Sequence, residues 1–386
     1  MKIVVALDSF KGSCSAIKAC QAVKEGLLTA SLDSQVITCP ISDGGEGFID
    51  SLYPTLQEQG FVKHQLTVMG PEGKSVLASF LYNPHLKEAL LEMAQCCGLE
   101  LGTKQGEIAT TYGLGQLVLY VISLGAQSIK IGLGGSATND AGTGFAQALG
   151  AKFFDAQGQE ITTPMCAQIL SKIALVDTSA IDGLLNKVKI TGTCDVNNPL
   201  TGPQGATYVF GPQKGVVNLA AIDKSMAALA CLMDKHYGKE ISQQAGAGAA
   251  GGMGAAILWF AQGTLERGID MVIKTLKLEE QLQDSSLVIV GEGCMDGQSL
   301  QGKAPLGVAK IALRSNIPVI AICGSLGADY ERLYECGISA IFPICPGPIS
   351  LQESMARTSE LLKNTSFNLM RALQAITAID IRHDLP

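Results

Sequence analysis

The stretch that decides this fold reads Ile131-Gly132-Leu133-Gly134-Gly135-Ser136-Ala137-Thr138-Asn139-Asp140. An apolar run at 128–131 predicts a strand before it, and small residues at 141–149 predict the start of a helix after it. Its glycines let the backbone turn sharply and approach a ligand closely. The N–H groups at the start of the next helix would favour an anion. The stretch therefore predicts a phosphate-binding loop, and the competing interpretation is a tight turn before a capped helix.

Polar side chains of the same stretch add groups that a phosphate ligand needs. Ser136, Thr138 and Asn139 offer hydrogen-bond donors. Asp140 adds a carboxylate that could hold a cation or accept a proton. All four are therefore candidate site residues.

Length and composition limit the class of protein. A chain of 386 residues more often folds as two domains than as one. The sequence is 47% hydrophobic, yet charges and glycines interrupt every long apolar run, so no transmembrane helix is expected. The N-terminus lacks a signal-peptide pattern and the twelve cysteines lack metal-type spacing, so we expect a cytoplasmic protein with reduced thiols. A net charge of −7 argues against nucleic acid as a partner.

Two predicted strands near the N-terminus each end in an acidic loop. Apolar residues at 2–6 and 35–41 predict the strands, and a helix is expected between them with Ser13 as its N-cap. The loops that follow are Asp8-Ser9-Phe10-Lys11 and Asp43-Gly44-Gly45-Glu46. In open α/β sheets, ligands lie at the carboxyl ends of the strands. Both loops are therefore candidate ligand contacts, although each acid could instead simply cap a helix.

The same strand pattern returns near the C-terminus. Runs at 287–290, 318–323 and 340–345 predict three further strands, each ending in a loop that contains glycine. Together with the N-terminal pair they make five parallel-type strands separated by helices. This order predicts an α/β fold with a flavodoxin-like parallel sheet that is built from both chain ends.

The predicted domains follow from this pattern. Residues 1–61 and 285–386 would form the flavodoxin-like domain, which is discontinuous in sequence. Residues 62–284, with a hairpin at 66–82, would form an inserted second α/β domain. We expect the active site in a cleft between the domains, and we expect this cleft to close over the substrate because water must be kept from the γ-phosphate.

Residues 297–304 match the Walker A pattern except at the last position. Ala304 lacks the hydroxyl that a P-loop supplies to magnesium, so we do not predict a P-loop NTPase. A magnesium ion would need carboxylates here, and Glu292 and Asp296 are the nearest. Lys303 is expected to meet a phosphate, unless it is only a solvated residue before a helix.

The glycine-dense run at 245–256 leaves two interpretations open. It could bind phosphate or ribose through Gly251 and Gly252, or two backbones could pack closely there. A separate turn at 210–215 carries Lys214, a further candidate cation for phosphate.

Seven motifs, in order along nearly the whole chain, closely resemble those of the bacterial class I glycerate kinase family. They are Asp8-Ser9-Phe10-Lys11, Asp43-Gly44-Gly45-Glu46-Gly47, 132–140, Cys194-Asp195-Val196, 210–215, 246–255 and 291–299. The resemblance implies ATP-dependent phosphorylation of D-glycerate to phosphoglycerate in carbon catabolism, with ATP and Mg²⁺ as cofactors. It also implies two α/β domains, one of them flavodoxin-like. Members of the family often carry Arg after Gly-Glu-Gly, but Cys294 stands here, so any role of that Arg in binding phosphate or carboxylate would be weakened or pass to Lys303.

The chemistry of phosphoryl transfer assigns roles to the candidate residues. The reaction needs charge neutralised on the γ-phosphate and a carboxylate near the acceptor hydroxyl. Asp195 is the expected catalytic carboxylate, Lys11 and Lys303 are the expected catalytic lysines, and Glu292 and Asp296 are the expected metal ligands. Lys11 and the Gly44-Gly45 loop would bind the carboxylate of glycerate. The expected substrate- and phosphate-binding residues are Asp8, Ser9, Asp43, Gly44, Gly45, Glu46, Gly134, Gly135, Ser136, Thr138, Asn139, Asp140, Lys214, Gly251, Gly252, Gln298 and Ser299.

Two other functional classes stay open. A nicotinamide-dependent oxidoreductase fits Gly132-x-Gly134-x-x-Ala137, with Asp155 ending a predicted strand at 151–154. A two-lobed, non-catalytic binding protein for small molecules would need no metal-type carboxylates. An unrelated kinase group with a Gly-Leu-Gly-Ser-Ser-Ala loop fits less well, because the rest of its pattern is missing. A small-molecule substrate is the expected partner, nucleic acid and membrane are not, and assembly into a homodimer is left open.

Overall fold

The computed structural model describes residues 1–42, 44–45, 47–301 and 304–383, and the chain divides into two compact units. The terminal unit is Met1–Asp43 with Ile269–Pro386, and the central unit is Gly44–Gly268. These limits differ from the predicted boundaries at 61 and 285. The reason is packing: helix α2 (Phe48–Glu58) contacts the sheet of the central unit, while Ile269 of α10 (Gly268–Thr275) lies against Gly307 of the terminal unit.

The sheet of the terminal unit is parallel throughout. Its strands are β1 (Lys2–Leu7), β2 (Gln35–Thr38), β11 (Leu287–Gly291), β13 (Val319–Cys323) and β15 (Ala340–Pro343). They lie in the order β15-β13-β11-β1-β2, with Val5 opposite Ile289 in the register of the β1–β11 pair. The flavodoxin-like sheet built from both chain ends is therefore confirmed.

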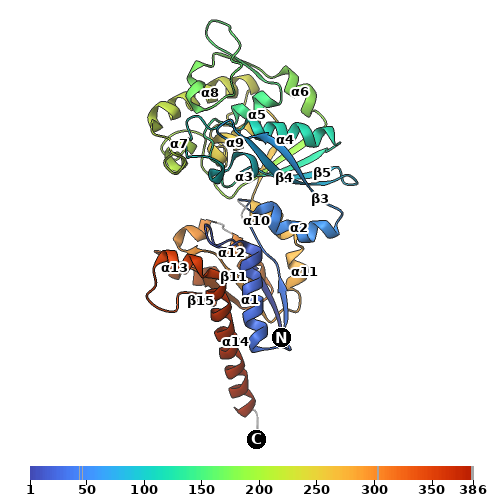
Figure 1. Ribbon diagram of the computed structural model, residues 1–386, viewed down its shortest axis with the longest axis vertical. Coiled ribbons are helices and arrows are strands. Elements are labelled where there is room, and N and C mark those ends of the chain that lie inside the picture. The colour runs from blue at the N-terminus through green and yellow to red at the C-terminus, as the bar shows by residue number, and fades with distance from the viewer. Residues whose placement is uncertain (43, 46, 302–303, 384–386) are drawn as a thin grey trace. The chain divides into compact units, whose positions relative to one another are not determined.

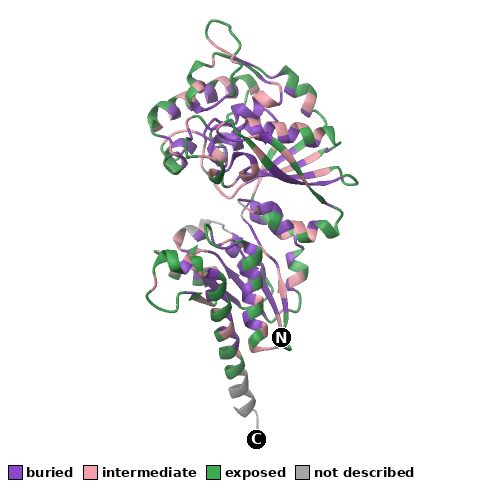
Figure 2. Ribbon diagram, viewed as in Figure 1, coloured by how far each residue is buried: buried purple, intermediate pink, exposed green. Residues whose placement is uncertain are grey.

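Helices cover this sheet on both faces, which is why its central strands are buried and almost purely apolar. Alternate residues of β1, such as Ile3 and Val5, share one cluster with side chains of α1 (Ala16–Ala30) and α14 (Thr358–His383), two helices that lie side by side (Figure 1). Helix α12 (Ala304–Arg314) packs on β11, β1 and β13. Figure 2 shows the resulting buried strands between more exposed helices.

The predicted start of α1 was wrong by two residues. Ser15, not Ser13, is the N-cap, and its side chain accepts from the N–H of Lys18. The Ser13 hydroxyl instead donates to the carbonyl of Met355 at 2.7 Å. A tertiary contact therefore overrides the capping preference of Ser13.

The sheet of the central unit is mixed. Its strands are β3 (Val62–Met69), β4 (Ser75–Asn83), β5 (Glu88–Glu92), β6 (Ser128–Gly132), β9 (Lys189–Thr193) and β10 (Thr264–Glu266), in the order β10-β9-β6-β5-β4-β3. Strands β3 and β4 form an antiparallel pair, which confirms the predicted hairpin, and β4 also pairs antiparallel with β5. From β5 to β10 the pairing is parallel, so the carboxyl ends of four strands share one edge.

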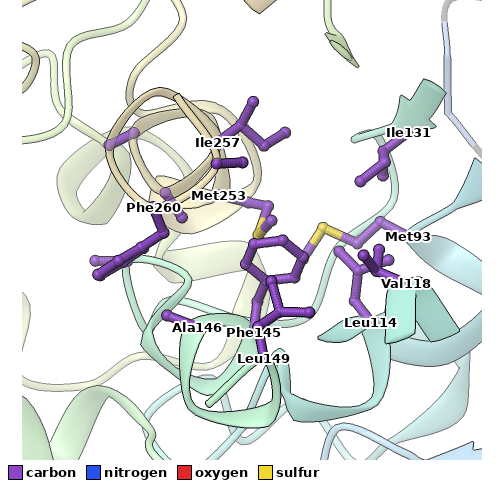
Figure 3. Close-up of a cluster of buried hydrophobic side chains, with 14 of the residues drawn as sticks. Met93, Leu114, Val118, Ile131, Phe145, Ala146, Leu149, Met253, Ile257 and Phe260 are labelled. Carbon is purple, nitrogen blue, oxygen red and sulfur yellow. The ribbon is translucent and has the colours of Figure 1, made fainter. Parts of the chain in front are cut away.

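Phe145 lies at the centre of the apolar packing next to residues 131–140. This residue belongs to α5 (Thr143–Ala148), and Figure 3 shows its ring with the sulfur atoms of Met93 and Met253 on either side. Helix α4 (Tyr112–Ser123) approaches closely because Gly115 has no side chain: a Cβ there would lie 2.6 Å from the carbonyl oxygen of Phe145. Helix α5 is therefore fixed by apolar packing at the point where the stretch ends.

The remaining elements complete both units. They are α3 (Ala94–Cys97), η1 (Leu99–Leu101), β7 (Lys152–Phe154), η2 (Ala167–Lys172), β8 (Leu175–Asp177), α6 (Ser179–Leu185), α7 (Ala206–Phe210), η3 (Pro212–Lys214), α8 (Leu219–Tyr237), α9 (Ala249–Trp259), α10 (Gly268–Thr275), α11 (Leu278–Leu282), β12 (Cys294–Met295), η4 (Gly297–Gln301), β14 (Ser325–Leu326), η5 (Tyr330–Cys336) and α13 (Leu351–Ala356). No helix in the described part of the chain is long and apolar enough to span a membrane.

Candidate functional site

The terminal unit has a topological switch point between β1 and β11. From β1 the chain runs through α1 to β2 on one side, whereas from β11 it runs through α12 to β13 on the other. Loops that follow two such strands diverge and leave a crevice at the carboxyl edge of the sheet. The loop after β1 carries Asp8, Ser9 and Lys11, and the loop after β11 carries Glu292. The structure therefore brings four predicted site residues to one edge.

A cavity of about 540 Å³ lies at this edge. Ser9, Lys11 and Glu292 contribute polar groups to its lining, and Phe10 and Ile344 contribute apolar surface. Its volume is in the range of pockets that bind small molecules. Asp8 is not among the lining residues: its side chain is buried, and its Oδ1 accepts from the N–H of Ser9 at 2.6 Å. Asp8 thus helps to shape the turn that presents Ser9 and Lys11.

The two predicted metal ligands meet at one serine. Ser299 donates its hydroxyl to Glu292 Oε1 at 2.8 Å and its N–H to Asp296 Oδ1 at 3.2 Å, and it is fully buried. Both carboxylates therefore lie near each other, held by η4. Magnesium takes only one or two carboxylates and completes its octahedron with water and phosphate, so this donor set fits the ion. Within the described ranges, no group of three or more His, Cys, Asp or Glu side chains could hold a metal by itself.

Asp43, Glu46 and Lys303 lie outside the described residues, as does the side chain of Gln298.

Two glycine motifs converge in the central unit. Gly134 donates its N–H to the carbonyl of Gly44 at 3.1 Å, and a Cβ on Gly134 would collide with the Cα of Gly45. A Cβ on Gly44, whose φ is +84°, would lie 3.1 Å from Thr193 Oγ1. The Gly44-Gly45 segment therefore crosses the carboxyl ends of β6 and β9. Its place in the central unit depends on glycine at both motifs.

Glu92, at the carboxyl end of β5, binds the backbone that follows the Gly44-Gly45 segment. It was not among the predicted site residues. Its carboxylate accepts from the N–H of Gly47 at 2.9 Å and from that of Ile49 at 3.0 Å, at the start of α2. Burial raises the pKa of Glu92 to about 7, and the two N–H donors oppose that rise. An acidic residue directly after the apolar run 89–91 was the available signal.

The N–H groups at the start of α5, where an anion was expected, donate to side chains of the protein. Asp140 is fully buried and accepts from Thr111 N–H at 2.9 Å, Thr111 Oγ1 at 2.8 Å, Gly142 N–H at 3.1 Å and Gly144 N–H at 3.2 Å. The N–H of Phe145 donates to Thr111 Oγ1 at 2.7 Å. These backbone donors are thus used inside the protein, whereas among the described residues the buried Thr138 Oγ1 has no hydrogen-bond partner. Burial raises the pKa of Asp140, and its hydrogen bonds oppose that rise.

Lys214 is tied to the same stretch. Its ammonium donates to Ser136 Oγ at 2.8 Å and to the carbonyl of Thr138 at 2.7 Å, and the residue is only 2% exposed. Burial lowers the pKa of Lys214 to about 7, against the attraction of Asp140. Lys214 is therefore a buried side chain that stabilises the conformation of the loop at 136–138.

The glycine-dense run at 245–256 packs against residues 138–141. A Cβ on Gly251 would collide with the carbonyl of Thr138, and one on Gly252 would lie 2.6 Å from the Cα of Ala141. Both glycines have positive φ, +70° and +96°. Asn139 donates from Nδ2 to Thr207 Oγ1 at 3.0 Å. Close backbone packing thus explains the glycines, and Gly135 is the exposed residue of the decisive stretch.

Asp195 follows β9 and so lies at the carboxyl edge of the central sheet, the edge that also carries Gly44 and Gly134. Its side chain is 11% exposed, and Arg267 Nε is 3.9 Å from Asp195 Oδ1. Arg267 follows β10, the neighbour of β9, and the sequence analysis missed it. The pairing of β9 with β10 is what brings this cation to the predicted catalytic carboxylate.

The dinucleotide-binding alternative fails on topology. A dinucleotide fold needs a parallel strand that carries the acid after the glycine loop and helix. Here β7, which precedes Asp155, pairs antiparallel with β8 in a separate two-stranded sheet. Asp155 Oδ1 accepts from the N–H groups of Gln157 and Gln159, so it closes a local turn.

Comparison with known proteins gives one consistent result. The sequence profile of the glycerate kinase family matches residues 3–374. A glycerate kinase of Bacillus subtilis (strain 168) is 40% identical over 379 residues, which cover 97% of this chain and 98% of that protein. A glycerate 2-kinase of Escherichia coli (strain K12) is 40% identical over 383 residues, 98% of this chain and 97% of that protein. A crystal structure from Salmonella typhimurium LT2, of a protein assigned as glycerate kinase 2, has a TM-score of 0.81 at 38% identity and covers 98% of this chain and 99% of that one. The chain belongs to the glycerate kinase family.

Proposed function

We propose that this protein transfers the γ-phosphoryl group of ATP to D-glycerate, with the 2-hydroxyl as acceptor. One observation carries the proposal: each unit presents acidic side chains at the carboxyl ends of its parallel strands, in a chain of a kinase family. Asp195 is the acid of the central unit, and Glu292 with Asp296 form the acidic pair of the terminal unit. The choice of hydroxyl rests on the relative from Escherichia coli, whose name specifies glycerate 2-kinase.

Asp195 is proposed to accept a hydrogen bond from the acceptor hydroxyl and to remove its proton as the new P–O bond forms. A carboxylate in this role must stay ionised and must not rotate freely. Arg267 Nε, 3.9 Å from Asp195 Oδ1, places a positive charge beside this carboxylate. The backbone of Gly44, Gly45 and Gly134 at the same sheet edge is proposed to bind the carboxylate of glycerate.

Glu292 and Asp296 are proposed to hold magnesium, with Ser299 keeping the two carboxylates together. When bound, the ion would neutralise charge on the phosphates of ATP. Lys11 was expected to bind the carboxylate of glycerate, but it is exposed at the cavity that Glu292 also lines, so it is proposed to contact the phosphate chain instead. Lys303 and Gln298 keep the same proposed role from the sequence pattern, and Lys214 is proposed to position the loop at 136–138.

A cytoplasmic location is proposed from the state of the cysteines. All twelve are free thiols, and seven of them are buried. Proteins of oxidising compartments usually pair their cysteines, so this pattern favours a reducing one.

Measuring ADP release from ATP, Mg²⁺ and D-glycerate tests the function. A coupled assay with enolase and pyruvate kinase identifies 2-phosphoglycerate directly, whereas 3-phosphoglycerate gives a signal only after phosphoglycerate mutase is added. Absence of ADP release would remove the kinase proposal, and turnover of a nicotinamide cofactor instead would favour an oxidoreductase. A non-catalytic binding protein would bind glycerate without any turnover.

Asp195→Asn should lower kcat by at least about a hundredfold, because it removes the charge and keeps the size. The matched control is Asp182→Asn, which changes an exposed acid of the same unit and should leave kcat within about twofold. Equal activity of both variants would exclude Asp195 from the chemistry.

A further inference from the structure

The proposed function places the phosphate chain of ATP near Lys11 but leaves the apolar part of the cavity in the terminal unit without an occupant. We propose that this cavity binds the adenosine part of ATP, with the phosphate chain near Lys11 and Glu292. This proposal rests on the proposed kinase function and assigns the nucleotide to the terminal unit.

The cavity lies at the edge of the sheet where a ligand is expected. The cavity lies where the connections of β1 and β11 diverge, and it is lined from both loops, by Ser9 and Lys11 after β1 and by Glu292 and Gly293 after β11. The carboxyl ends of strands at such a point are the general ligand site of open parallel sheets.

Much of the lining of the cavity is apolar. Beyond the polar loops, the segment after β15 contributes the apolar side chains of Ile344, Ile349, Leu351 and Met355, together with the hydroxyls of Ser354 and Thr358. Leu351 is 76% exposed although it lines a cavity, so it offers apolar surface that a ligand would cover. A purine base gains from apolar walls on its faces. Glycerate carries an oxygen on each of its three carbons and gains almost nothing from them.

The lining joins two kinds of surface. Polar side chains come from the loops after β1 and β11, and most of the apolar side chains come from the segment after β15. A ligand that covers both must be apolar in one part and anionic in another. ATP has this form, and D-glycerate does not.

The walls are held in place without a ligand. Ser13 of the loop after β1 donates to the carbonyl of Met355 at 2.7 Å, and Cys345 Sγ donates to the carbonyl of Gly324 at 3.6 Å. The apolar wall is therefore tied both to the loop after β1 and to the loop after β13. A preformed cavity costs little ordering on binding.

Two cysteines of the cavity make the proposal directly testable. Cys294 and Cys345 are exposed and line the cavity, whereas Cys231 is exposed on α8 of the central unit. The full-length protein is alkylated with iodoacetamide, and the rate at each cysteine is read by peptide mass spectrometry. Adenosine and ATP should slow alkylation of Cys345 and Cys294 at least about tenfold, while Cys231 reacts at an unchanged rate.

Other additions decide between occupants. Tripolyphosphate should leave Cys345 unprotected, because it lacks the base. D-glycerate alone should protect neither cavity cysteine. Protection by D-glycerate and not by adenosine would overturn the proposal, as would full reactivity of both cysteines with saturating ATP. Protection by adenosine in a protein that phosphorylates no glycerate would support the nucleoside site and remove the kinase function.

A matched pair of variants gives an independent test. Leu351→Ser should raise KM for ATP about tenfold and leave KM for glycerate unchanged, because the lost apolar contact concerns the base. Leu32→Ser changes a leucine that is 87% exposed in the same unit and does not line the cavity. Its KM values should match those of the unaltered enzyme. If Leu351→Ser raises KM for glycerate instead, the cavity is a glycerate site and the proposal is wrong.

Discussion

Replacing Lys214 by Met should change how the stability of the central unit depends on pH. The folded protein keeps Lys214 buried with a pKa of about 7, whereas in the unfolded chain its pKa returns to about 10.5. Between these values the unfolded state binds more protons than the folded state, so stability rises with pH. Met has a similar length and no charge, so this contribution disappears in the variant.

The magnitude follows from the two pKa values. From pH 7 to pH 9 the unfolded lysine stays protonated while the folded lysine loses the half proton it still holds at pH 7. This difference corresponds to about 2 kcal/mol of added stability in the unaltered protein relative to Lys214→Met. The free energy of unfolding of Lys214→Met is subtracted from that of the unaltered protein at each pH. Groups that titrate in the same way in both proteins cancel in this difference.

Trp259 provides the assay. It is the single tryptophan of the chain and is fully buried in the central unit, so its fluorescence reports the unfolding of that unit by urea. The control is Lys172→Met, at an exposed lysine of the same unit, and its difference from the unaltered protein should not depend on pH. If the Lys214→Met difference is equally flat between pH 7 and pH 9, the ammonium is not buried as described and the reasoning fails.

Three further predictions concern other parts of both sites. Asp296→Asn should lower turnover at least about tenfold and regain part of it at high Mg²⁺, measured as ADP release; normal turnover at ordinary Mg²⁺ would remove Asp296 from the metal site. The pKa of Glu92 is about 7 in the folded protein, above its value of 4.5 in the unfolded chain. As the pH rises from 4.5 to 8, the free energy of unfolding of the unaltered protein should therefore fall by roughly 3 kcal/mol relative to that of Glu92→Gln. A difference that does not change with pH would contradict the burial of this carboxyl. Gly251→Ala should cost at least about 3 kcal/mol by urea unfolding, because the new methyl would collide with a carbonyl at positive φ, whereas Gly183→Ala, with open space around it, should cost under about 1 kcal/mol; equal costs would refute the packing argument.

The terminal sheet could be predicted because its strands are continuous apolar runs. Ile3-Val4-Val5 and Val288-Ile289-Val290 are buried on both faces, which leaves a strong pattern in the sequence. The limits of the units could not be predicted in this way. Helix α2 follows a strand of one unit in sequence but packs on the other, and its first turn is bound by Glu92, a contact with a residue more than forty positions away.

The candidate site shows the same division between local and distant causes. Gly134 and Gly44 were recognisable because glycine is needed wherever backbones approach closely, but their hydrogen bond joins two motifs that only the fold brings together. The side chains of Ser136 and Lys214 were assigned to a ligand, since serine and lysine side chains look alike in the sequence whether they bind phosphate or one another. Burial decides between these roles, and burial of a loop depends on what packs over it.

The pairing of β1 with β11 also determines the order in which the chain can fold during synthesis. The first strand leaves the ribosome with Ile3-Val4-Val5-Ala6-Leu7 and can initially pair only with β2, because its other neighbour begins at Leu287. The whole of Gly44–Gly268 is made in the interval and can collapse on its own core. Until β11 emerges, one apolar strand edge stays open to pairing with other chains. We therefore expect nascent chains truncated before Leu287 to aggregate through their first strand and to depend on chaperones, whereas the completed chain closes that edge itself.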